Sequence, residues 1–467
     1  MSNDRKNQGV RASRTILGIF CSLGIMLALS GCGGSSDYSI EGNITVGGAA
    51  LPAATVTLSG SGSQTVTTDA NGRYFFDGLT GGIYSVTPSF PGYTFIPPYR
   101  KAYLDGMVAT DFDFAAIVTG RLATTNHTIF QKSDGTVWTW GHNASGQLGD
   151  GTTTDSSLPV QVNSLTNVTA VAAGNDHTAA LKSDGTVWTW GANNRGQLGN
   201  GTTTDSSLPV QVSNLANVTA VAAGNNHTAA VKSDGTIWTW GANDRGQLGN
   251  GTTTDSSLPV QVSNLANVTA VAAGNNHTAV LNSDGTVFTW GANDQGQLGN
   301  NITTDSTVPV QTAGLHSIIA IAASRDHTVA LRNDLTVLKV WCWGNNASGQ
   351  LGNGTITNSP TPVEPIGLPS VTAVAAGYDH TVVLANDGTV WTWGGNASGQ
   401  LGNGTITDSF LPMQVTSLAN VTALAAGNQD SMVLKSDGTL WVWGSNGFGQ
   451  LGDGTTINTS TPLQVVP

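Results

Sequence analysis

The chain has few charged residues, and basic ones are especially scarce. Only 10% of its 467 residues are charged, and 17 Lys and Arg stand against 29 Asp and Glu, for a net charge of -12. Basic residues cluster only near the N-terminus, between Arg5 and Arg14. Binding to nucleic acid depends on basic side chains that neutralise phosphates, which an acidic surface repels. The composition therefore predicts no nucleic-acid partner.

Cysteine is almost absent, with three copies at Cys21, Cys32 and Cys342. The first two lie in or directly after the N-terminal apolar segment, so only Cys342 remains in the body of the chain. We therefore expect no intrachain disulfide. Cys342 takes the place of Thr in a recurring Trp-Thr-Trp run, which favours a plain strand residue over a reactive thiol.

The apolar run at the N-terminus is too short to be a membrane helix. It covers residues 16–29, fourteen in all, whereas a spanning helix needs about 20. It follows a basic stretch that ends at Arg14, the arrangement of a signal peptide. We therefore predict that residues 1–31 are a targeting segment outside the fold.

The end of this segment, Leu29-Ser30-Gly31-Cys32, resembles the processing box of bacterial lipoproteins. The resemblance implies cleavage before Cys32 and acylation of that cysteine, with residues 32–37 as a short flexible tether. It also implies a location in the cell envelope of a bacterium, at the outer membrane or the cell surface. The alternative is an ordinary secretory peptide that happens to end near a cysteine.

Residues 38–115 differ in pattern from the rest of the chain. Short strands are predicted between turn residues, at Ser39–Val46, Ala54–Leu58, Gln64–Thr68, Tyr74–Phe76 and Tyr84–Pro88. With its Asp69-Ala70-Asn71-Gly72 turn before an aromatic strand, the segment resembles carboxypeptidase-regulatory-like and collagen-adhesin B-type domains. That resemblance implies a small β-sandwich that acts as a spacer. Asp69, Asn71 and Asp77 could also suggest calcium, but a turn is the simpler interpretation.

The remainder, residues 116–467, consists of repeats. The pair Trp-Gly recurs every 50 residues, apart from one interval of 53, at Trp140, Trp190, Trp240, Trp290, Trp343, Trp393 and Trp443. A fixed period of this length indicates a repeat architecture. Near-identical units rarely build one asymmetric active site.

One repeat predicts four short strands: Pro159–Val162, Val168–Ala173, His177–Lys182 and Thr186–Trp190. The second is apolar enough to be buried on both faces. Asp184-Gly185 marks a hairpin between the third and fourth. Four antiparallel strands per 50 residues are typical of a propeller blade.

The unit Ala172 to Leu181, followed by Asp184-Gly185, Trp190-Gly191 and Gly196-Gln197-Leu198-Gly199, resembles the regulator-of-chromosome-condensation repeat. The resemblance covers about 350 residues and implies an all-β fold, a seven-bladed β-propeller, after the small β-sandwich. Counting strands from Val118, the first unit lacks its Pro-Val-Gln-Val strand and the C-terminus has one left over. We therefore predict that Pro462 to Val466 closes the ring by completing the first blade.

Two recurring residue types invite functional readings. Histidine recurs at one repeat position, with Asp430 in the seventh copy. Each copy lies on a different blade, and only side chains close to the ring axis could converge on one metal. We therefore expect hydrogen-bonded histidines inside the blades and no metal site. The tryptophan pairs, such as Trp188 and Trp190, share one strand face, and packing between blades is favoured over a sugar-stacking platform. The recurring histidines are His127, His177, His227, His277, His327 and His380.

Signatures of catalysis are missing from the sequence. It has no Gly-x-Ser-x-Gly elbow, no phosphate loop with its lysine and no His-Glu-x-x-His. We therefore predict that the protein is not an enzyme, has no catalytic residues and uses no cofactor.

Differences between repeats concentrate in two stretches, one before the histidine position and one after Trp-Gly. In an up-and-down blade both stretches emerge at the same end, opposite the Asp-Gly hairpins. That end is the candidate binding face, although drift at tolerant loop positions is the competing explanation. Its candidate residues are Asp176, Arg195, Arg245, Arg325, Tyr378 and Phe448.

These features favour a monomeric, lipid-anchored binding, adhesion or scaffold module at the cell surface, with an unknown protein or glycan as its partner. Two alternatives remain. One is guanine-nucleotide exchange, as the resemblance to eukaryotic relatives implies, although a fold alone does not transfer that role. The other is inhibition of an extracellular enzyme, for which the face offers few aromatic anchors.

Overall fold

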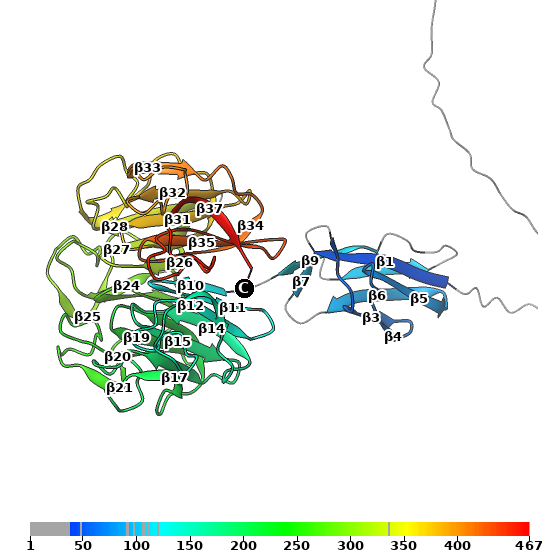
Figure 1. Ribbon diagram of the computed structural model, residues 1–467, viewed down its shortest axis with the longest axis horizontal. Coiled ribbons are helices and arrows are strands. Elements are labelled where there is room, and N and C mark those ends of the chain that lie inside the picture. Colours follow the sequence, from blue (N-terminus) through cyan, green and yellow to red (C-terminus); the bar gives the residue numbers. More distant parts are fainter. Residues whose placement is uncertain are drawn as a thin grey trace, which may run out of the picture.

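A computed structural model of the chain describes residues 38–46, 49–89, 93–96, 99–104, 109, 112–118, 121–334 and 337–466. The predicted signal peptide and tether, with Cys32, lie outside these residues. The described elements are β-strands that form a small N-terminal unit and a large ring (Figure 1). Within the described part of the chain, no helix has the length and apolar character that crossing a membrane requires.

The N-terminal unit consists of two β-sheets. One sheet has the order β2-β1-β9-β7, with β5 also paired to β1, and the other has the order β4-β3-β6-β8. The strands of the first are β1 (Tyr38–Val46), β2 (Ala49–Ala50), β5 (Arg73–Leu79), β7 (Tyr93–Ile96) and β9 (Phe114–Val118). Those of the second are β3 (Thr55–Gly60), β4 (Gln64–Thr67), β6 (Gly82–Ser89) and β8 (Arg100–Leu104).

Alternating apolar residues bring these two sheets together. Ile40 and Phe76 from the first sheet and Val56 and Val86 from the second are at most 1% exposed, and they belong to one buried cluster. Alternate residues of a strand point to one face, so each sheet buries one side. This arrangement confirms the predicted β-sandwich, and all five predicted strands are present.

The turn at Asp69 is held by the side chain of that residue. Asp69 Oδ1 accepts hydrogen bonds from the backbone N–H groups of Asn71 (2.8 Å) and Arg73 (2.9 Å). Gly72 follows with a positive φ of 73°. A side chain there would collide with the carbonyl oxygen of Ile44, 2.5 Å from its Cβ, so glycine is required on both counts.

The ring contains seven four-stranded antiparallel sheets, each built from four consecutive strands. We number them blade 1 (β10–β13) to blade 7 (β34–β37) along the chain. The first strands, which surround the axis, are β10 (Arg121–Thr124), β14 (Val168–Ala173), β18 (Val218–Ala223), β22 (Val268–Ala273), β26 (Ile318–Ala323), β30 (Val371–Ala376) and β34 (Val421–Ala426). The second strands are β11 (His127–Gln131), β15 (His177–Lys182), β19 (His227–Lys232), β23 (His277–Asn282), β27 (His327–Asn333), β31 (His380–Ala385) and β35 (Asp430–Lys435).

The third strand of each blade ends in Trp-Gly, and the fourth lies at the outer edge. The third strands are β12 (Val137–Gly141), β16 (Val187–Gly191), β20 (Ile237–Gly241), β24 (Val287–Gly291), β28 (Leu338–Gly344), β32 (Val390–Gly394) and β36 (Leu440–Gly444). The fourth strands are β13 (Ser156–Gln161), β17 (Ser206–Gln211), β21 (Ser256–Gln261), β25 (Ser306–Gln311), β29 (Ser359–Val363), β33 (Ser409–Gln414) and β37 (Thr459–Val465).

The predicted closure by the C-terminal strand is wrong. β37 pairs with β36 of its own blade, and β13 already completes blade 1 by pairing with β12. The Pro-Val-Gln-Val strand therefore belongs to the blade before it, because the chain folds back onto the Trp-Gly strand that it has just left. Within the described residues, each of the seven blades has its own four strands. Val118, expected to open the first blade, belongs to β9 instead.

At the ring closure, a hydroxyl and a tryptophan bond the carbonyl oxygen of a glutamine in the preceding blade, as they do between the other blades. Thr128 Oγ1 and Trp140 Nε1 of blade 1 donate hydrogen bonds to the carbonyl oxygen of Gln450 in blade 7, at 2.7 and 2.8 Å. Thr178 and Trp190 of blade 2 do the same to Gln147 of blade 1, at 2.9 and 2.8 Å. Figure 1 shows β10 beside the orange and red strands of blade 7.

The first strands are less buried than their apolar sequence predicts. Ala173, Ala223, Ala273 and their counterparts line an axial channel with a cavity of about 250 Å³. Small side chains let seven strands approach the axis, and those that face the channel stay partly exposed. The expectation of burial on both faces is therefore wrong for this strand.

The Gly-Gln-Leu-Gly loop fits around the tryptophan of the next blade. Gly149 has a φ of 71°, and a Cβ added to it would lie 2.7 Å from Trp190 Nε1. Trp190 is fully buried, in a cluster formed by residues of blades 1 and 2, and Trp188 packs against the same cluster while partly buried. The predicted packing of the tryptophans between blades is confirmed.

Candidate binding site at the loop face

The variable stretches emerge at one end of the ring, as the sequence predicts. In blade 2, His177 pairs with Gly191 at one end of the β15–β16 ladder, and Leu181 pairs with Val187 at the other. The loop before His177 and the loop after Gly191 therefore leave at the same end, opposite the hairpin. We call this end, formed by the equivalent loops of all seven blades, the loop face.

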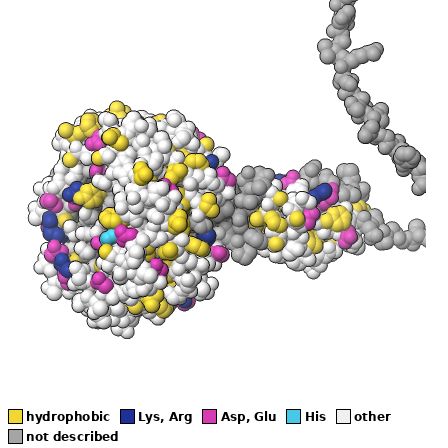
Figure 2. Space-filling model, viewed as in Figure 1, with side chains coloured by type: hydrophobic (Ala, Val, Ile, Leu, Met, Phe, Trp, Pro, Cys, Tyr) yellow, Lys and Arg dark blue, Asp and Glu magenta, His cyan; other side chains and the backbone are white. Residues whose placement is uncertain are grey.

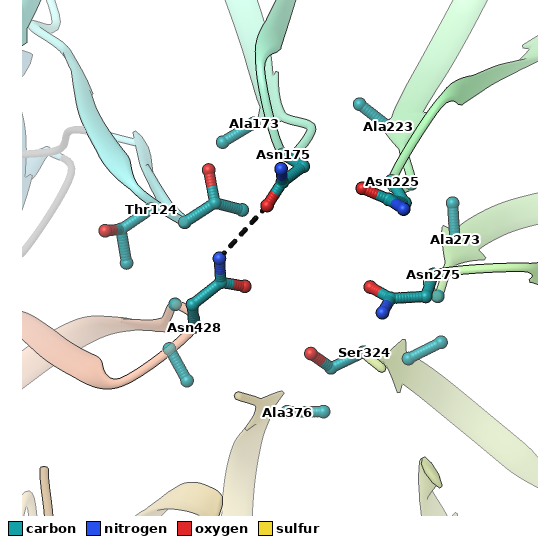
Figure 3. Close-up of a pocket in the computed structure, with 16 residues that line it drawn as sticks. Thr124, Ala173, Asn175, Ala223, Asn225, Ala273, Asn275, Ser324, Ala376 and Asn428 are labelled. Carbon is teal, nitrogen blue, oxygen red and sulfur yellow. Dashed lines mark hydrogen bonds between the residues drawn. The ribbon is translucent and has the colours of Figure 1, made fainter. Parts of the chain in front are cut away.

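A ring of uncharged polar side chains surrounds the channel mouth at the loop face. Asn175, Asn225, Asn275, Ser324 and Asn428 point toward the axis (Figure 3), around a cavity of about 90 Å³. The Asn428 amide donates to Asn175 Oδ1 at 3.2 Å, which links blades 7 and 2 across the mouth. Figure 2 shows that the surface of the ring is mostly uncharged, with scattered acidic and basic side chains.

Blades 5 and 6 interrupt this amide ring with an arginine and a tyrosine. Arg325 and Tyr378 occupy the repeat position that Asn175 and Asn428 hold in other blades. The Arg325 guanidinium lies 4.1 Å from the centre of the Tyr378 ring, a cation–π contact. Arg325 Nε also lies 3.2 Å from Asp326 Oδ2. Burial raises the pKa of Asp326, and the Arg325 charge opposes that rise.

Tyr378 and Phe448 line one pocket of about 280 Å³ at the loop face. Every side chain in the lining is uncharged at neutral pH. Its residues are Asn126, Tyr378, Asn428, Gln429, Ser445, Phe448 and Gln450. They come from blade 1, blade 6 and blade 7, so the pocket spans the seam where the two ends of the ring meet.

Contacts continue from Phe448 to a further candidate residue. The rings of Phe448 and His142 have centres 4.4 Å apart. His142 Nδ1 lies 3.3 Å from Asp176 Oδ1, and Gln147 Nε2 donates to the same oxygen at 3.3 Å. Of the six candidate residues, Tyr378 and Phe448 line this pocket and Arg325 contacts Tyr378. Asp176 is linked to Phe448 only through His142.

The other two candidates, Arg195 and Arg245, do not line the pocket. Arg195 forms a two-point ion pair with Asp255 of the next blade, with Nη2 3.0 Å from Oδ1. Arg245 pairs with Asp305 in the same way, also at 3.0 Å. Their charges are satisfied by the neighbouring blade, so we assign both arginines to blade contacts. Both arginines still lie in loops after Trp-Gly, at the end of the ring where the sequence predicts the binding face.

The recurring histidines also connect blades. Each is fully buried, and its Nε2 is hydrogen-bonded to a hydroxyl of the following blade, as His177 is to Thr228 at 2.9 Å. The expected partner inside the same blade was therefore wrong. Desolvation lowers the imidazole pKa to about 3 in His177 and about 4 in His227, so the rings are neutral. Among the described residues, no three His, Cys, Asp or Glu side chains are grouped to hold a metal ion.

Sequence comparison missed several residues of the pocket. Gln450 recurs in every repeat and therefore carries no signal of variation. Ser445 could have been found, because the residue directly after Trp-Gly also varies; its counterparts are His142, Ala192, Ala242, Ala292, Asn345 and Gly395. Asn126 and Gln429 share a repeat position just before the histidine, but they face one pocket only because the ring closes.

Comparison with known families agrees with this architecture. Residues 134–181 and 184–231 match the regulator of chromosome condensation (RCC1) repeat, as do 168–197 and 218–247, and residues 255–467 match the RCC1-like domain. The propeller is built of RCC1 repeats. Residues 39–96 match the carboxypeptidase regulatory-like domain. Both domain resemblances drawn from the sequence are thereby confirmed.

Solved RCC1-type propellers share the fold. Human WBSCR16 is 24% identical, with a TM-score of 0.64 over 71% of this chain and 95% of its own. Yeast RCC1 (Prp20), solved with Kap60 bound, is 23% identical, with a TM-score of 0.64 over 75% of this chain and 85% of its own. An RCC2 homolog from Danio rerio is 41% identical over 54 residues, only 11% of either chain. These similarities establish the fold of the RCC1-repeat ring and no further property.

Proposed function

We propose that this chain is a monomeric, non-catalytic binding module that a lipid on Cys32 holds at a bacterial cell envelope. The N-terminal β-sandwich serves as a spacer, and the loop face of the RCC1-repeat propeller binds a protein or a glycan. One observation carries this proposal: residues that differ between otherwise near-identical repeats converge on a single pocket at the loop face. Kap60 bound to yeast RCC1 (Prp20), a chain with a similar propeller, gives a precedent for a protein partner.

The lipid anchor has a direct test with a control inside the chain. Cells expressing the protein are fed labelled palmitate, and the purified chain is assayed for incorporation. Cys32→Ser is expected to abolish labelling, because that thiol is the proposed attachment atom. Cys342→Thr, which introduces the residue found in other repeats, is expected to leave labelling intact. Labelling that survives Cys32→Ser overturns the anchor.

The binding face is tested with arrays of envelope proteins and of glycans, probed with the full chain. The double change Tyr378→Asn and Phe448→Ser is expected to remove the specific signals. Ser233→Asn, at the exposed hairpin end of blade 3, should leave those signals unchanged. Binding that persists in the double variant, or that fails equally in the hairpin variant, contradicts the assignment of the loop face.

A further inference from the structure

We infer that the pocket between Tyr378 and Phe448 binds a neutral sugar ring, the terminal pyranose of a glycan. The inference rests on the proposed binding function and specifies its ligand. A protein side chain is the competing occupant, and the experiment below separates the two.

The first argument is the absence of charge in the lining. Four amides, one serine and two aromatic residues line the pocket, in a protein whose net charge is -12. Arg325 contacts the Tyr378 ring and its own neighbour Asp326, so its charge is already engaged. A charged ligand would lose hydration without gaining a charged partner, which is costly. A neutral polar ligand does not incur that cost.

The second argument is the set of free hydrogen-bonding groups on residues that line the pocket. Among the described residues, the Tyr378 hydroxyl, the Gln429 NH2 group and Asn428 Oδ1 have no hydrogen-bond partner within the protein. Gln429 Oε1 is held by Ser398 at 3.1 Å, which orients its NH2 group. The residues of the lining therefore carry a hydroxyl, a pure donor and a pure acceptor that the protein leaves free. Vicinal hydroxyl groups of a sugar can each donate and accept, and so can satisfy all three.

The Gln450 amide, in contrast, is fixed by the loop that carries Phe448. Gln450 Oε1 accepts from the Phe448 backbone N–H at 2.9 Å, and its NH2 group donates to Ser445 Oγ at 3.3 Å. These bonds hold the Phe448 loop in place before any ligand arrives. A preorganised site loses less conformational entropy on binding.

The third argument is the pair of aromatic rings. Phe448 is 39% exposed even though its ring lies against His142, and Tyr378 is partly exposed on the neighbouring blade 6. The apolar C–H face of a pyranose can pack on such rings while its hydroxyl groups reach the amides. At about 280 Å³ the pocket lies just below the range of about 300–1,000 Å³ that holds drug-sized ligands, so one sugar unit suits it.

The fourth argument is that the site occurs once in a sevenfold array. At the Tyr378 position the other blades carry Thr, Asn or Arg, and at the Phe448 position they carry Ser, Arg or Gln. Only the seam of blades 6, 7 and 1 combines two aromatic side chains. We therefore expect each chain to bind one sugar, and not one sugar at each repeat.

The repeats themselves supply variants that the fold already tolerates. Tyr378→Asn introduces the residue that blades 2 and 3 carry at Asn175 and Asn225. Phe448→Ser introduces the residue that blades 5 and 6 carry at Ser348 and Ser398. Each change removes an aromatic ring and introduces a residue that other blades already carry at the same repeat position.

The experiment uses the full chain in a zwitterionic detergent that has no sugar head group. It is titrated with neutral oligosaccharides ending in glucose, galactose, mannose or N-acetylglucosamine, and with uronate- and sialate-terminated ones, by calorimetry. We expect a neutral series to bind at one site per chain. Tyr378→Asn and Phe448→Ser should each weaken that binding at least tenfold, while Ser348→Ala in blade 5 leaves it unchanged.

Three results overturn the sugar site: no binding of any neutral series, stronger binding of the acidic sugars, or neutral binding that both variants retain. The protein array keeps this failure apart from failure of the binding module. A protein ligand lost on Tyr378→Asn and Phe448→Ser, with no sugar bound, overturns the sugar and supports the module. If the two variants still bind sugars and proteins as the original chain does, both the sugar site and the assignment of the binding face are overturned.

Discussion

At the scale of single residues, Asp430 makes the contact between blades 7 and 1 unlike the other six. Elsewhere a buried histidine bonds a hydroxyl of the following blade, as His380 bonds Ser431 at 3.0 Å. Asp430 instead accepts a hydrogen bond from Thr124 Oγ1 at 2.5 Å, and its Oδ1 has no partner. Desolvation by burial raises the pKa of Asp430 to about 7.

This raised pKa predicts a loss of stability as the pH rises. The folded chain keeps a proton on Asp430 that the unfolded chain, with a pKa of about 3.9, has already released. Stability from this group is therefore complete below pH 4 and declines up to about pH 7. At about 1.4 kcal/mol per pKa unit, the total is on the order of 4 kcal/mol. Asp430→Asn should remove this contribution.

The measurement is urea unfolding of both chains at pH 5 and pH 8. The stability of the original chain should fall more between these values than that of Asp430→Asn, because the amide does not titrate. Asp437→Asn, on an exposed hairpin of the same blade, is the matched control. Equal pH slopes for the original chain and Asp430→Asn would falsify this assignment.

The sequence shows that Asp430 replaces the histidine of the other repeats, but it does not predict the hydrogen-bond partner of Asp430. Thr124 lies 306 residues away and belongs to the opposite end of the repeat array. A local pattern shows that a histidine has been replaced. Only the closed ring brings the aspartate against the first blade.

At the scale of the strand, the two tryptophans of Trp-Thr-Trp differ in depth. Trp190 is fully buried between blades and donates its Nε1 hydrogen to the Gln147 carbonyl. Trp188 is only partly buried, with the Lys182 ammonium 5.8 Å from its ring centre. Strand alternation correctly places both side chains on one face, but it cannot say which one the neighbouring blade covers.

We predict unequal costs for replacing these two tryptophans. Trp190→Ala should destabilise the chain by about 3–5 kcal/mol, as buried Trp-to-Ala changes do, because it opens a cavity between blades. Trp188→Phe should cost less than about 1.5 kcal/mol, since blade 4 already carries Phe288 at this position. Guanidinium unfolding monitored by far-UV circular dichroism checks both. If both changes lowered the free energy of unfolding by similar amounts, the burial of the tryptophan between blades would not determine its contribution to stability.

At the scale of the whole molecule, the ring closes without exchanging a strand between its ends. In the structure Leu463 of β37 is the direct partner of Val442 in β36. Closure by the C-terminal strand would instead place Leu463 beside blade 1, near Thr139, whose actual partner is Val160. The two arrangements therefore differ in which pair of residues is adjacent.

Cysteine pairs in a Cys342→Thr background distinguish these arrangements. Val442→Cys with Leu463→Cys should form a disulfide on mild oxidation, because directly paired residues of antiparallel strands lie close enough for a bond. Thr139→Cys with Leu463→Cys should stay reduced. Mass spectrometry of the alkylated chains reads out both results, and the reverse pattern would restore closure by strand exchange.

The sequence by itself determined the all-β class, the number of repeats, the four strands in each and the end at which the copies differ. These properties depend on local patterns: alternation, turn residues and a constant period. The tertiary structure decided where each blade begins, how the ring closes and which variable residues share a pocket. A strand that lies between two Trp-Gly strands can be assigned to either repeat without changing the pattern, so only its hydrogen bonds settle the choice. Likewise, Asn126 and Tyr378 line one pocket because blades distant in the chain become neighbours when the ring closes.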